Sequence, residues 1–224
     1  QRQMCIRDSS KILIVGDVML DKYYFGKVDR ISPEAPVPIV NIQKEESRLG
    51  GASNVANNIV SLGGHSLLCG VIGHDLFGKE IERISRHKNI DTFLLKTSSP
   101  TITKARIIGG KQQIVRVDYE DKSELNADNK KLFRDTISRI LPEYDILVIS
   151  DYGKGLISED LCRYLIKLAH KYDKKVIIDP KGKNWEKYSG ADIVTPNVKE
   201  LSDIVGYTVP NTDRAIEKAA REAI

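Results

Sequence analysis

Hydrophobic and polar positions along the chain form strand-like runs that alternate with helix-like stripes. The first run, KILIVG at residues 11–16, is continuously apolar at its centre and ends in a glycine, which is typical of a strand buried in a parallel sheet. Similar runs predict further strands at residues 66–73, 145–150, 175–179 and 192–195.

Between these runs, apolar residues recur every three or four positions, which is the period of an amphipathic helix. The first stripe lies between Gly50-Gly51 and Gly63-Gly64 and consists of Ala52, Val55, Ala56, Ile59 and Leu62. Other stripes predict helices at residues 76–87, 127–141, 158–172 and about 198–205. This alternation predicts an α/β fold with a doubly wound, mostly parallel sheet and helices on both faces.

Two segments break the alternation and predict short strands outside the main sheet. Residues 22–43 hold KYYFGKV and VPIVNIQ around the proline-rich DRISPEAPVP. Residues 101–119 have the pattern of a hairpin with Gly109-Gly110 at its turn.

The two ends of the chain depart from these patterns. Residues 1–10 have neither period, so we expect a non-native or disordered tail, with a short native tail as the alternative. Near the other end, Asn211-Thr212-Asp213 predicts a helix start before RAIEKAAREAI, whose apolar face requires a partner. No Gly, Asn or Pro ends this helix, so we expect residues 11–224 to be an incomplete domain that lacks a following strand.

Composition narrows the class of protein. Among 224 residues, 35 Lys and Arg against 31 Asp and Glu give a net charge of +4, which suits a small anionic ligand and argues against nucleic acid. No apolar run approaches the roughly 18 residues of a membrane span, so no membrane partner is expected. Cys5, Cys69 and Cys162 form no CxxC pair, which favours a reducing, cytoplasmic location over disulfides or zinc.

Polar side chains follow most of the predicted strands. They are Asp17, Asp21, Asp75, Asp151, Lys154, Asp179, Lys181, Asn197 and Glu200. Each by itself is typical of a turn or a helix cap. Together they indicate a site, because an α/β sheet binds ligands at the carboxyl ends of its strands.

Two further groups have a functional and a structural interpretation. Gly50-Gly51 at a helix start allows a ligand to approach backbone N–H groups, and Asn54 suits sugar hydroxyls; a glycine-rich turn with an ordinary helical Asn is the alternative. Lys104, Arg106, Lys111 and Arg116 make the hairpin basic. Lys104 and Arg106 share one strand face and can hold a phosphate, unless they form a solvated edge strand.

Two glycine motifs are poor matches to nucleotide-binding loops. The segment 73–80, GHDLFGKE, has Glu80 where a Mg²⁺-binding hydroxyl is required, so Asp75 is expected to cap a helix instead. The segment 153–158, GKGLIS, lacks the third glycine of a dinucleotide fingerprint, which leaves a nicotinamide-dependent enzyme as a minor alternative.

Eight blocks of residues 11–224 resemble, in order, the ribokinase-like (phosphofructokinase-B-type) carbohydrate kinases. They are GDVMLDKYYFG (16–26), RISPEAPVPIV (30–40), GGASNVANNIVSLG (50–63), PTITKARI (100–107), QQIVRVDYE (112–120), SDYGKG (150–155), IDPKG (178–182) and TPNVKEL (195–201). The block RISPEAPVP resembles the sequence found in one branch of this family, the kinases that convert D-glycero-β-D-manno-heptose 7-phosphate to the 1,7-bisphosphate. This resemblance implies a role in ADP-heptose and lipopolysaccharide core synthesis.

On the sugar side, the resemblance implies that Asp21 binds sugar hydroxyls and that Gly50, Gly51 and Asn54 form the sugar-binding turn. Residues 22–43 and 101–119 resemble the family's small β lid, which often joins two subunits into a homodimer. By charge, we assign Lys104, Arg106 and Arg116 to the phosphate that the sugar already carries.

On the nucleotide side, Asn197, Val198, Lys199 and Glu200 match the family's NxxE motif, which helps organise ATP and Mg²⁺. Glu200 is expected to act on the metal indirectly. The family's catalytic base lies in a Gly-Ala-Gly-Asp turn that the 224 residues do not contain, so we expect the base beyond Ile224 and little activity from this chain. A kinase for another sugar or sugar phosphate, and a non-catalytic sugar-phosphate-binding fragment, remain as alternatives.

Overall fold

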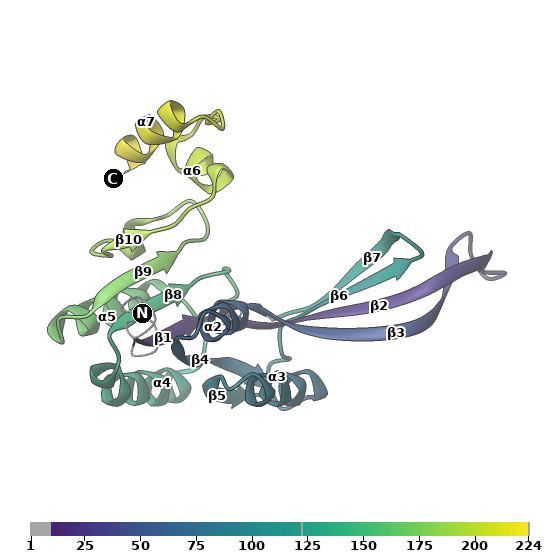
Figure 1. Cartoon of the computed structure of the whole chain (residues 1–224), viewed down its shortest axis with the longest axis horizontal. Helices are drawn as coiled ribbons and strands as arrows, with labels where there is room; N and C mark the ends of the chain where they lie inside the picture. Colours follow the sequence, from purple (N-terminus) through teal and green to yellow (C-terminus); the bar gives the residue numbers. More distant parts are fainter. Residues whose placement is uncertain (1–9, 122, 224) are drawn as a thin grey trace.

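The strands form two sheets that lie end to end in a computed structural model, which describes residues 10–121 and 123–223 (Figure 1). Residues 1–9 of the expected tail lie outside the described residues. Sheet A has the order β10-β9-β8-β1-β4-β5, and every neighbouring pair is parallel. Its strands are β1 (Lys11–Gly16), β4 (His65–Gly73), β5 (Asp91–Thr97), β8 (Ile146–Ser150), β9 (Lys175–Asp179) and β10 (Ile193–Val194).

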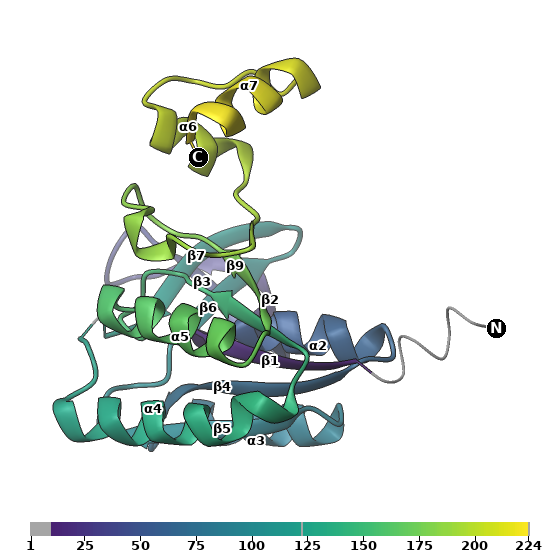
Figure 2. The same cartoon turned by 90° about the vertical axis from the view of Figure 1, so that its left-hand side faces the viewer.

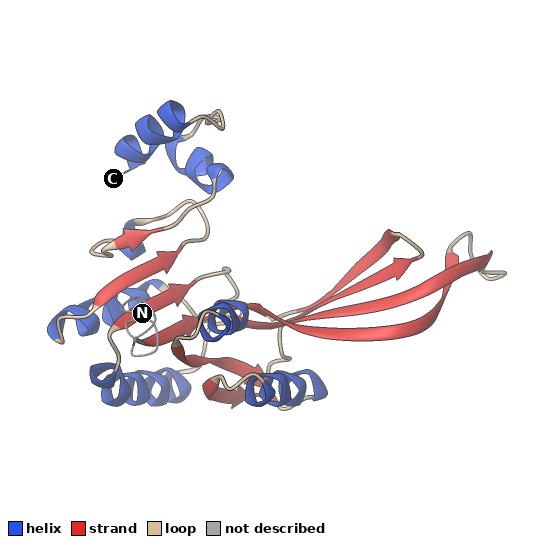
Figure 3. Ribbon diagram, in the orientation of Figure 1, coloured by secondary structure: helices blue, strands red, loops and turns tan. Residues whose placement is uncertain are grey.

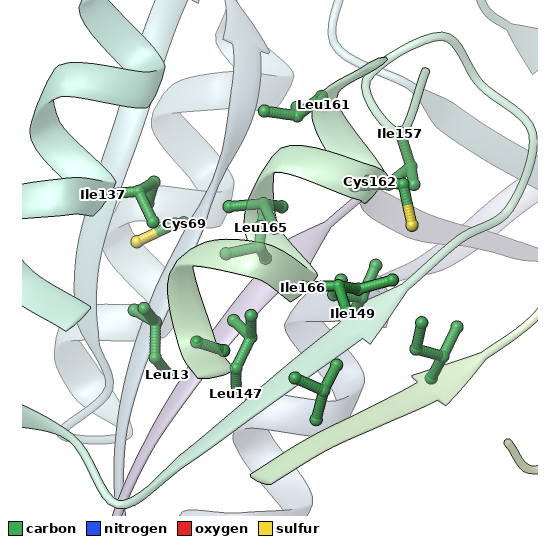
Figure 4. Close-up of a cluster of buried hydrophobic side chains, with 14 of the residues drawn as sticks. Leu13, Cys69, Ile137, Leu147, Ile149, Ile157, Leu161, Cys162, Leu165 and Ile166 are labelled. Carbon is green, nitrogen blue, oxygen red and sulfur yellow. The ribbon is translucent and has the colours of Figure 1, made fainter. Parts of the chain in front are cut away.

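Helices cover both faces of sheet A, as the alternation predicts (Figure 2). They are α2 (Ala52–Ser61), α3 (Leu76–His87), α4 (Ala127–Ile140) and α5 (Glu159–Lys171), with short 3-10 turns η1 (Leu141–Glu143) and η2 (Glu186–Tyr188). Side chains alternate along β1, so Leu13 and Val15 pack with α4 and α5 while Ile14 packs with α2 and α3. Figure 4 shows the first of these cores around Leu165. The doubly wound α/β fold is thus confirmed.

Sheet B projects from sheet A as an arm of strands (Figure 3). It contains β2 (Val18–Ile31), β3 (Pro38–Gly51), β6 (Thr103–Gly109) and β7 (Gln112–Tyr119), in the order β3-β2-β6-β7. The hairpin at 101–119 is confirmed, whereas the strands expected within 22–43 are longer than predicted. β2 follows β1 after one residue and pairs with β3 as far as Gly51, so the second strand extends to the start of α2.

Two smaller expectations differ from the structure. No strand was predicted at residues 91–97, where DTFLLKT forms the edge strand β5. Its side chains are half-buried or exposed, so hydrophobic and polar residues do not alternate strictly and the sequence gives no clear strand pattern. Leu62 was expected on the buried face of its helix but is 68% exposed, because α2 ends at Ser61.

The last two helices, α6 (Val198–Val205) and α7 (Asp213–Ala223), lie together beyond the β10 edge (Figure 1). Leu201, Val209 and Ala219 form their shared core. The apolar face of α7 was expected to require a further strand, but α6 packs against this face instead. Ile224, the last residue of the predicted face, lies outside the described residues. Within 10–121 and 123–223, we find no helix with the length and apolar character of a membrane span.

Candidate functional site

Three carboxylates stand at the carboxyl edge of sheet A, one at the end of each of three neighbouring strands. Asp17 follows β1, Asp151 follows β8, and Asp179 ends β9. In sheet A, β4 lies on one side of β1, and β8, which comes later in the chain, lies on the other side. Ligands of doubly wound sheets bind at such a reversal of strand order, so the polar groups predicted from the sequence gather where a site is expected.

Asp17 is 2% exposed and fixes the loop that follows β8. Its Oδ2 atom accepts hydrogen bonds from the N–H groups of Tyr152, at 2.8 Å, and Lys154, at 3.1 Å. Burial raises the pKa of Asp17; these N–H groups oppose the shift, and the charge of Asp151 adds to it. Asp17 therefore connects the end of β1 to loop 151–156.

Asp151 is also 2% exposed, but it has a cationic partner. Lys187 Nζ forms an ion pair with Asp151 Oδ2, and the Tyr188 hydroxyl donates to the same oxygen at 2.7 Å. Gly153 N–H donates to Oδ1 at 2.7 Å. Sequence reasoning missed Lys187 and Tyr188, because a Lys-Tyr pair in a short turn carries no recognisable pattern.

Asn197 and Glu200 of the NxxE motif form the N-terminal cap of α6. Asn197 Oδ1 accepts from Glu200 N–H at 2.9 Å, and Glu200 Oε2 accepts from Asn197 N–H at 3.0 Å, which is a capping box. Glu200 is 8% exposed, and its Oε1 pairs with Lys181 Nζ at 2.9 Å. Val198 packs toward α7, while Lys199 is exposed.

The charges of Glu200 and Lys181 also act on the pKa of Asp179. Burial raises its pKa and the charge of Glu200 adds to the shift, while Lys181 opposes it. Glu200 and Lys181 therefore meet at the start of α6, where an anion would find backbone N–H groups, and the charge of Glu200 acts on Asp179.

Asp21 and Arg106 form an ion pair at the base of sheet B, with 2.6 Å between Asp21 Oδ1 and Arg106 Nη1. The double glycine packs directly against this region. A Cβ atom on Gly50 would lie 2.6 Å from Asp21 Oδ2, and one on Gly51 would lie 2.4 Å from the Asp17 carbonyl oxygen. The glycines therefore allow the β3–α2 turn to approach both carboxylate-bearing segments.

Tyr152 lies between the two groups of predicted residues. Lys104, the register partner of Asp21, places its Nζ atom 5.8 Å from the centre of the Tyr152 ring. Burial raises the pKa of Tyr152, and the charges of Asp179, Glu200 and Asp21 add to the shift. The carboxylates of both groups thus act on the pKa of one phenol, while their convergence on a single pocket stays a prediction.

Two cations stack on one aromatic ring beside Asp21. The guanidinium carbons of Arg48 and Arg106 lie 4.9 Å and 5.2 Å from the centre of the Tyr23 ring. Arg48 is the register partner of Asp21 on β3, so both side chains lie on one face of sheet B. Sequence reasoning missed Arg48, because its position opposite Asp21 depends on the β2–β3 register.

Two predicted residues, Arg116 and Asn54, form no hydrogen bond with the Asp21–Arg106 pair in the described part of the chain. Arg116 faces Arg106 in the β6–β7 register, but its guanidinium is held by the Asp118 carboxylate at 2.8 Å and 2.9 Å. Asn54 is exposed on the first turn of α2. Their roles, like those of the other predicted site residues, stay predictions.

The model of the pfkB family carbohydrate kinases matches residues 9–224. The chain belongs to the pfkB family. Its enzymes are phosphotransferases that act on the alcohol group of a carbohydrate. This assignment removes the nicotinamide-dependent alternative. The phosphate-loop-like segment 73–80 is a helix start, in which Asp75 caps α3 by accepting from Gly78 N–H at 2.8 Å.

Curated relatives of this pfkB-family chain are longer than it is. The chain is 48% identical over 193 residues to the "Bifunctional protein HldE" of Helicobacter pylori (strain P12), covering 85% of this chain and 42% of that protein. It is 44% identical over 213 residues to the "D-beta-D-heptose 7-phosphate kinase" of Bordetella bronchiseptica, covering 95% of this chain and 66% of the relative.

Solved structures share the fold of this pfkB-family chain. Phosphofructokinase-2 from Escherichia coli, in complex with substrates and products, has a TM-score of 0.73 at 21% identity over 96% of this chain and 69% of that one. Ribokinase from Arabidopsis thaliana, complexed with ribose and ATP, has a TM-score of 0.68 at 18% identity over 96% and 68%. At these identities, the likeness concerns the fold.

Proposed function

We propose that this chain binds D-glycero-β-D-manno-heptose 7-phosphate against the polar face of sheet B, as part of an ATP-dependent kinase. The kinase would phosphorylate the anomeric hydroxyl to give the 1,7-bisphosphate for ADP-heptose and lipopolysaccharide core synthesis. The names of the relatives, HldE and D-beta-D-heptose 7-phosphate kinase, support this substrate. The structural observation that carries the proposal is the Asp21–Arg106 pair.

The pair combines the two chemistries that a sugar phosphate requires. A carboxylate accepts hydrogen bonds from sugar hydroxyls, and a guanidinium binds a phosphate through parallel N–H groups. Asp21 and Arg106 satisfy each other at 2.6 Å, and the Tyr23 ring supports the guanidinium. A substrate with both a hydroxyl and a phosphate would replace this mutual contact, with Lys104 beside it.

We assign ATP and Mg²⁺ to the start of α6. Mg²⁺ in kinases is held by one or two carboxylates together with phosphates and water, and Asp179 fits that role, with the Glu200–Lys181 pair beside it. In the described part of the chain, no group of three or more potential ligands forms a protein cage for a metal. Bound Mg²⁺ would neutralise phosphate charge, with Glu200 acting indirectly because its oxygens serve Asn197 and Lys181.

We expect the 224 residues to transfer phosphate poorly by themselves, because the printed sequence contains no Gly-Ala-Gly-Asp turn. General-base assistance is worth roughly 10²–10⁴-fold in rate. Binding of the sugar phosphate is therefore a sharper test of this chain than turnover.

We further propose a homodimer through sheet B in the cytoplasm. Alternation along β7 places Val115 and Val117 on the face opposite Arg116, and they are 44% and 39% exposed. Val28 and Ile42 are exposed on the same sheet at 40% and 39%. An apolar face of this kind favours a second copy of the chain. The cytoplasmic location is supported by Cys69 and Cys162, which are buried as free thiols.

Calorimetric titration of the chain with heptose 7-phosphate and with unphosphorylated heptose tests the substrate. We expect Arg106→Gln to weaken binding of the phosphorylated sugar about 10-fold or more and to leave binding of the free sugar nearly unchanged. Asp21→Asn should weaken binding of both sugars. Arg83→Gln, which removes an exposed arginine paired with Glu80 on α3, is the matched control.

The proposal fails if heptose 7-phosphate does not bind, or if Arg83→Gln and Arg106→Gln have the same effect. Tighter binding of fructose 6-phosphate or ribose 5-phosphate would instead favour a kinase for another sugar phosphate. Normal turnover by the chain would contradict the expected loss of activity and leave the substrate assignment intact.

A further inference from the structure

One side chain closes the loop that leads from β9 toward β10. Tyr188, the last residue of η2, is 3% exposed, and its hydroxyl accepts a hydrogen bond from the N–H group of Lys181 at 2.8 Å. Because these residues are seven positions apart, the bond ties the two ends of loop 181–188 together. The loop starts just after Asp179, the last residue of β9, so Tyr188 fixes the backbone at the carboxyl end of this strand.

The Tyr188 hydroxyl also connects the loop to the neighbouring strand. A hydroxyl carries one hydrogen, which has two acceptors within reach: Asp151 Oδ2 at 2.7 Å and the Lys181 carbonyl oxygen at 3.1 Å. The carboxylate is the nearer acceptor and it is charged, so it takes the hydrogen. The hydroxyl therefore accepts from the loop and donates to the residue that follows β8.

Asp151 is a fixed acceptor for this hydroxyl. Lys187 Nζ forms an ion pair with the same Oδ2 atom and compensates the buried charge, while Gly153 N–H donates to Oδ1 at 2.7 Å. The N–H group of Asp151 donates to the Asp179 carbonyl oxygen at 3.0 Å, which continues the pairing of β8 with β9. The position of Tyr188 is thus set by the sheet itself.

Lys181 carries the effect of this contact to the start of α6. Its Nζ atom pairs with Glu200 Oε1 at 2.9 Å, and Glu200 forms the capping box of α6 with Asn197. The Lys181 side chain is 49% exposed, so water competes for the ammonium group and the ion pair by itself holds it weakly. The bond from Lys181 N–H to Tyr188 fixes the other end of this side chain.

We propose that Tyr188 is a positioning residue for the nucleotide: its hydroxyl holds the backbone of Lys181 so that the Lys181 ammonium group meets the phosphates of ATP at the start of α6. This inference rests on the proposed assignment of ATP to that position. Tyr188 acts through Lys181, since its own ring is buried and its hydroxyl is occupied by Lys181 and Asp151.

Calorimetric titration of the whole chain with MgATP and, separately, with heptose 7-phosphate tests this role. We expect Tyr188→Phe, which removes only the hydroxyl, to weaken MgATP binding about 10-fold and to leave the affinity for heptose 7-phosphate unchanged. Tyr207→Phe is the matched control, because the Tyr207 hydroxyl also donates to a carboxylate, Glu222 Oε2 at 2.8 Å, but at an exposed site. Its MgATP affinity should equal that of the unaltered chain.

A double-variant cycle separates positioning from a merely structural role. Lys181→Met should weaken MgATP binding by about the same factor as Tyr188→Phe, and the chain with both substitutions should bind no more weakly than Lys181→Met, because the hydroxyl acts through Lys181. Additive losses would overturn the proposal. Normal MgATP binding by Tyr188→Phe, or an equal loss of affinity for MgATP and heptose 7-phosphate, would overturn it as well.

The fluorescence of Trp185 tests the holding contact without a nucleotide. Trp185 is the only tryptophan in the sequence, and its Nε1 atom donates to the Gly182 carbonyl oxygen at 3.2 Å within the same loop. We expect Tyr188→Phe to shift its emission to longer wavelength, and unchanged emission would overturn the holding contact. Failure of the unaltered chain to bind MgATP, or full affinity in Lys181→Met, would instead overturn the assignment of ATP to the start of α6.

Discussion

Single glycines decide how closely the β3–α2 turn approaches the sheet. Gly51 ends β3 and caps α2 with a φ of +55°, in the left-handed region that favours glycine. A Cβ atom there would also lie 2.4 Å from the Asp17 carbonyl oxygen and 2.7 Å from Met19 Cε. Backbone strain and a backbone clash therefore act together at this position.

We expect Gly51→Ala to lower the free energy of unfolding by more than about 2 kcal/mol, as strain and steric clash add. Gly110→Ala is the matched control, because Gly110 has a similar φ of +64° but open space around its Cβ position. It should cost about 1 kcal/mol. Urea unfolding measures both, and an equal loss in the two variants would show that the clash is relieved.

At the scale of elements, one carboxylate joins a helix to the loop that leads into sheet B. Asp75 Oδ1 accepts from Gly78 N–H and from the Thr101 hydroxyl, and Oδ2 accepts from Thr101 N–H at 2.7 Å. Burial by itself raises the pKa of Asp75, but the bonds from Thr101 and Gly78 outweigh it, and the net pKa is lowered. This cap therefore also positions the start of β6.

We expect Asp75→Ala to destabilise the chain by about 1–3 kcal/mol near neutral pH, since it removes a helix cap and leaves the N–H and the hydroxyl hydrogen of Thr101 without their acceptor. Because the folded pKa is depressed, the carboxylate stabilises above its ordinary value of 3.8 and loses this effect as the pH falls below that value. Urea unfolding at neutral and acidic pH measures the difference.

Asn126→Ala is the control for the cap by itself, because Asn126 caps α4 at an exposed site with one bond, to Asn129 N–H at 2.9 Å. It should cost about 1 kcal/mol at both pH values. If Asp75→Ala costs no more than this control, or if its effect does not change with pH, the link between α3 and β6 contributes nothing to stability.

At the scale of the whole molecule, sheet B has two unlike faces. Asp21, Arg48 and Arg106 lie on the face toward the Tyr152 loop, while Val115 and Val117 lie on the other. A sheet that presents charge to a ligand and apolar side chains to solvent is expected to cover the apolar face by association.

We expect Val115→Glu to shift the chain from dimer to monomer in sedimentation equilibrium, because a charge would be buried in the interface. Leu132→Glu is the matched control, since Leu132 is 47% exposed on α4, a helix that packs against sheet A. A chain that is monomeric without any substitution, or a dimer that survives Val115→Glu, would contradict association through this face.

The sequence predicted helices and strands well where apolar residues recur with a regular period or where a capping or turn residue marks the end of the element. Helix 76–87 begins after Asp75 and ends as expected, and the hairpin at 101–119 turns at its glycines. Strand β5 was missed because its edge position leaves no clear period. At the site, Asp21 and Arg106 were predicted but their mutual pairing was not, because residues 85 positions apart meet only through the β2–β6 register.

The sequence by itself determined the α/β class, the family resemblance, and the residue types at the strand ends, because period, capping and turn chemistry act over a few residues. Only the tertiary structure decided which of those residues meet. The β2–β3 register places Arg48 beside Asp21, and the neighbouring positions of β1 and β8 place Asp17 against Tyr152. Such contacts depend on strand order and register, which no local pattern encodes.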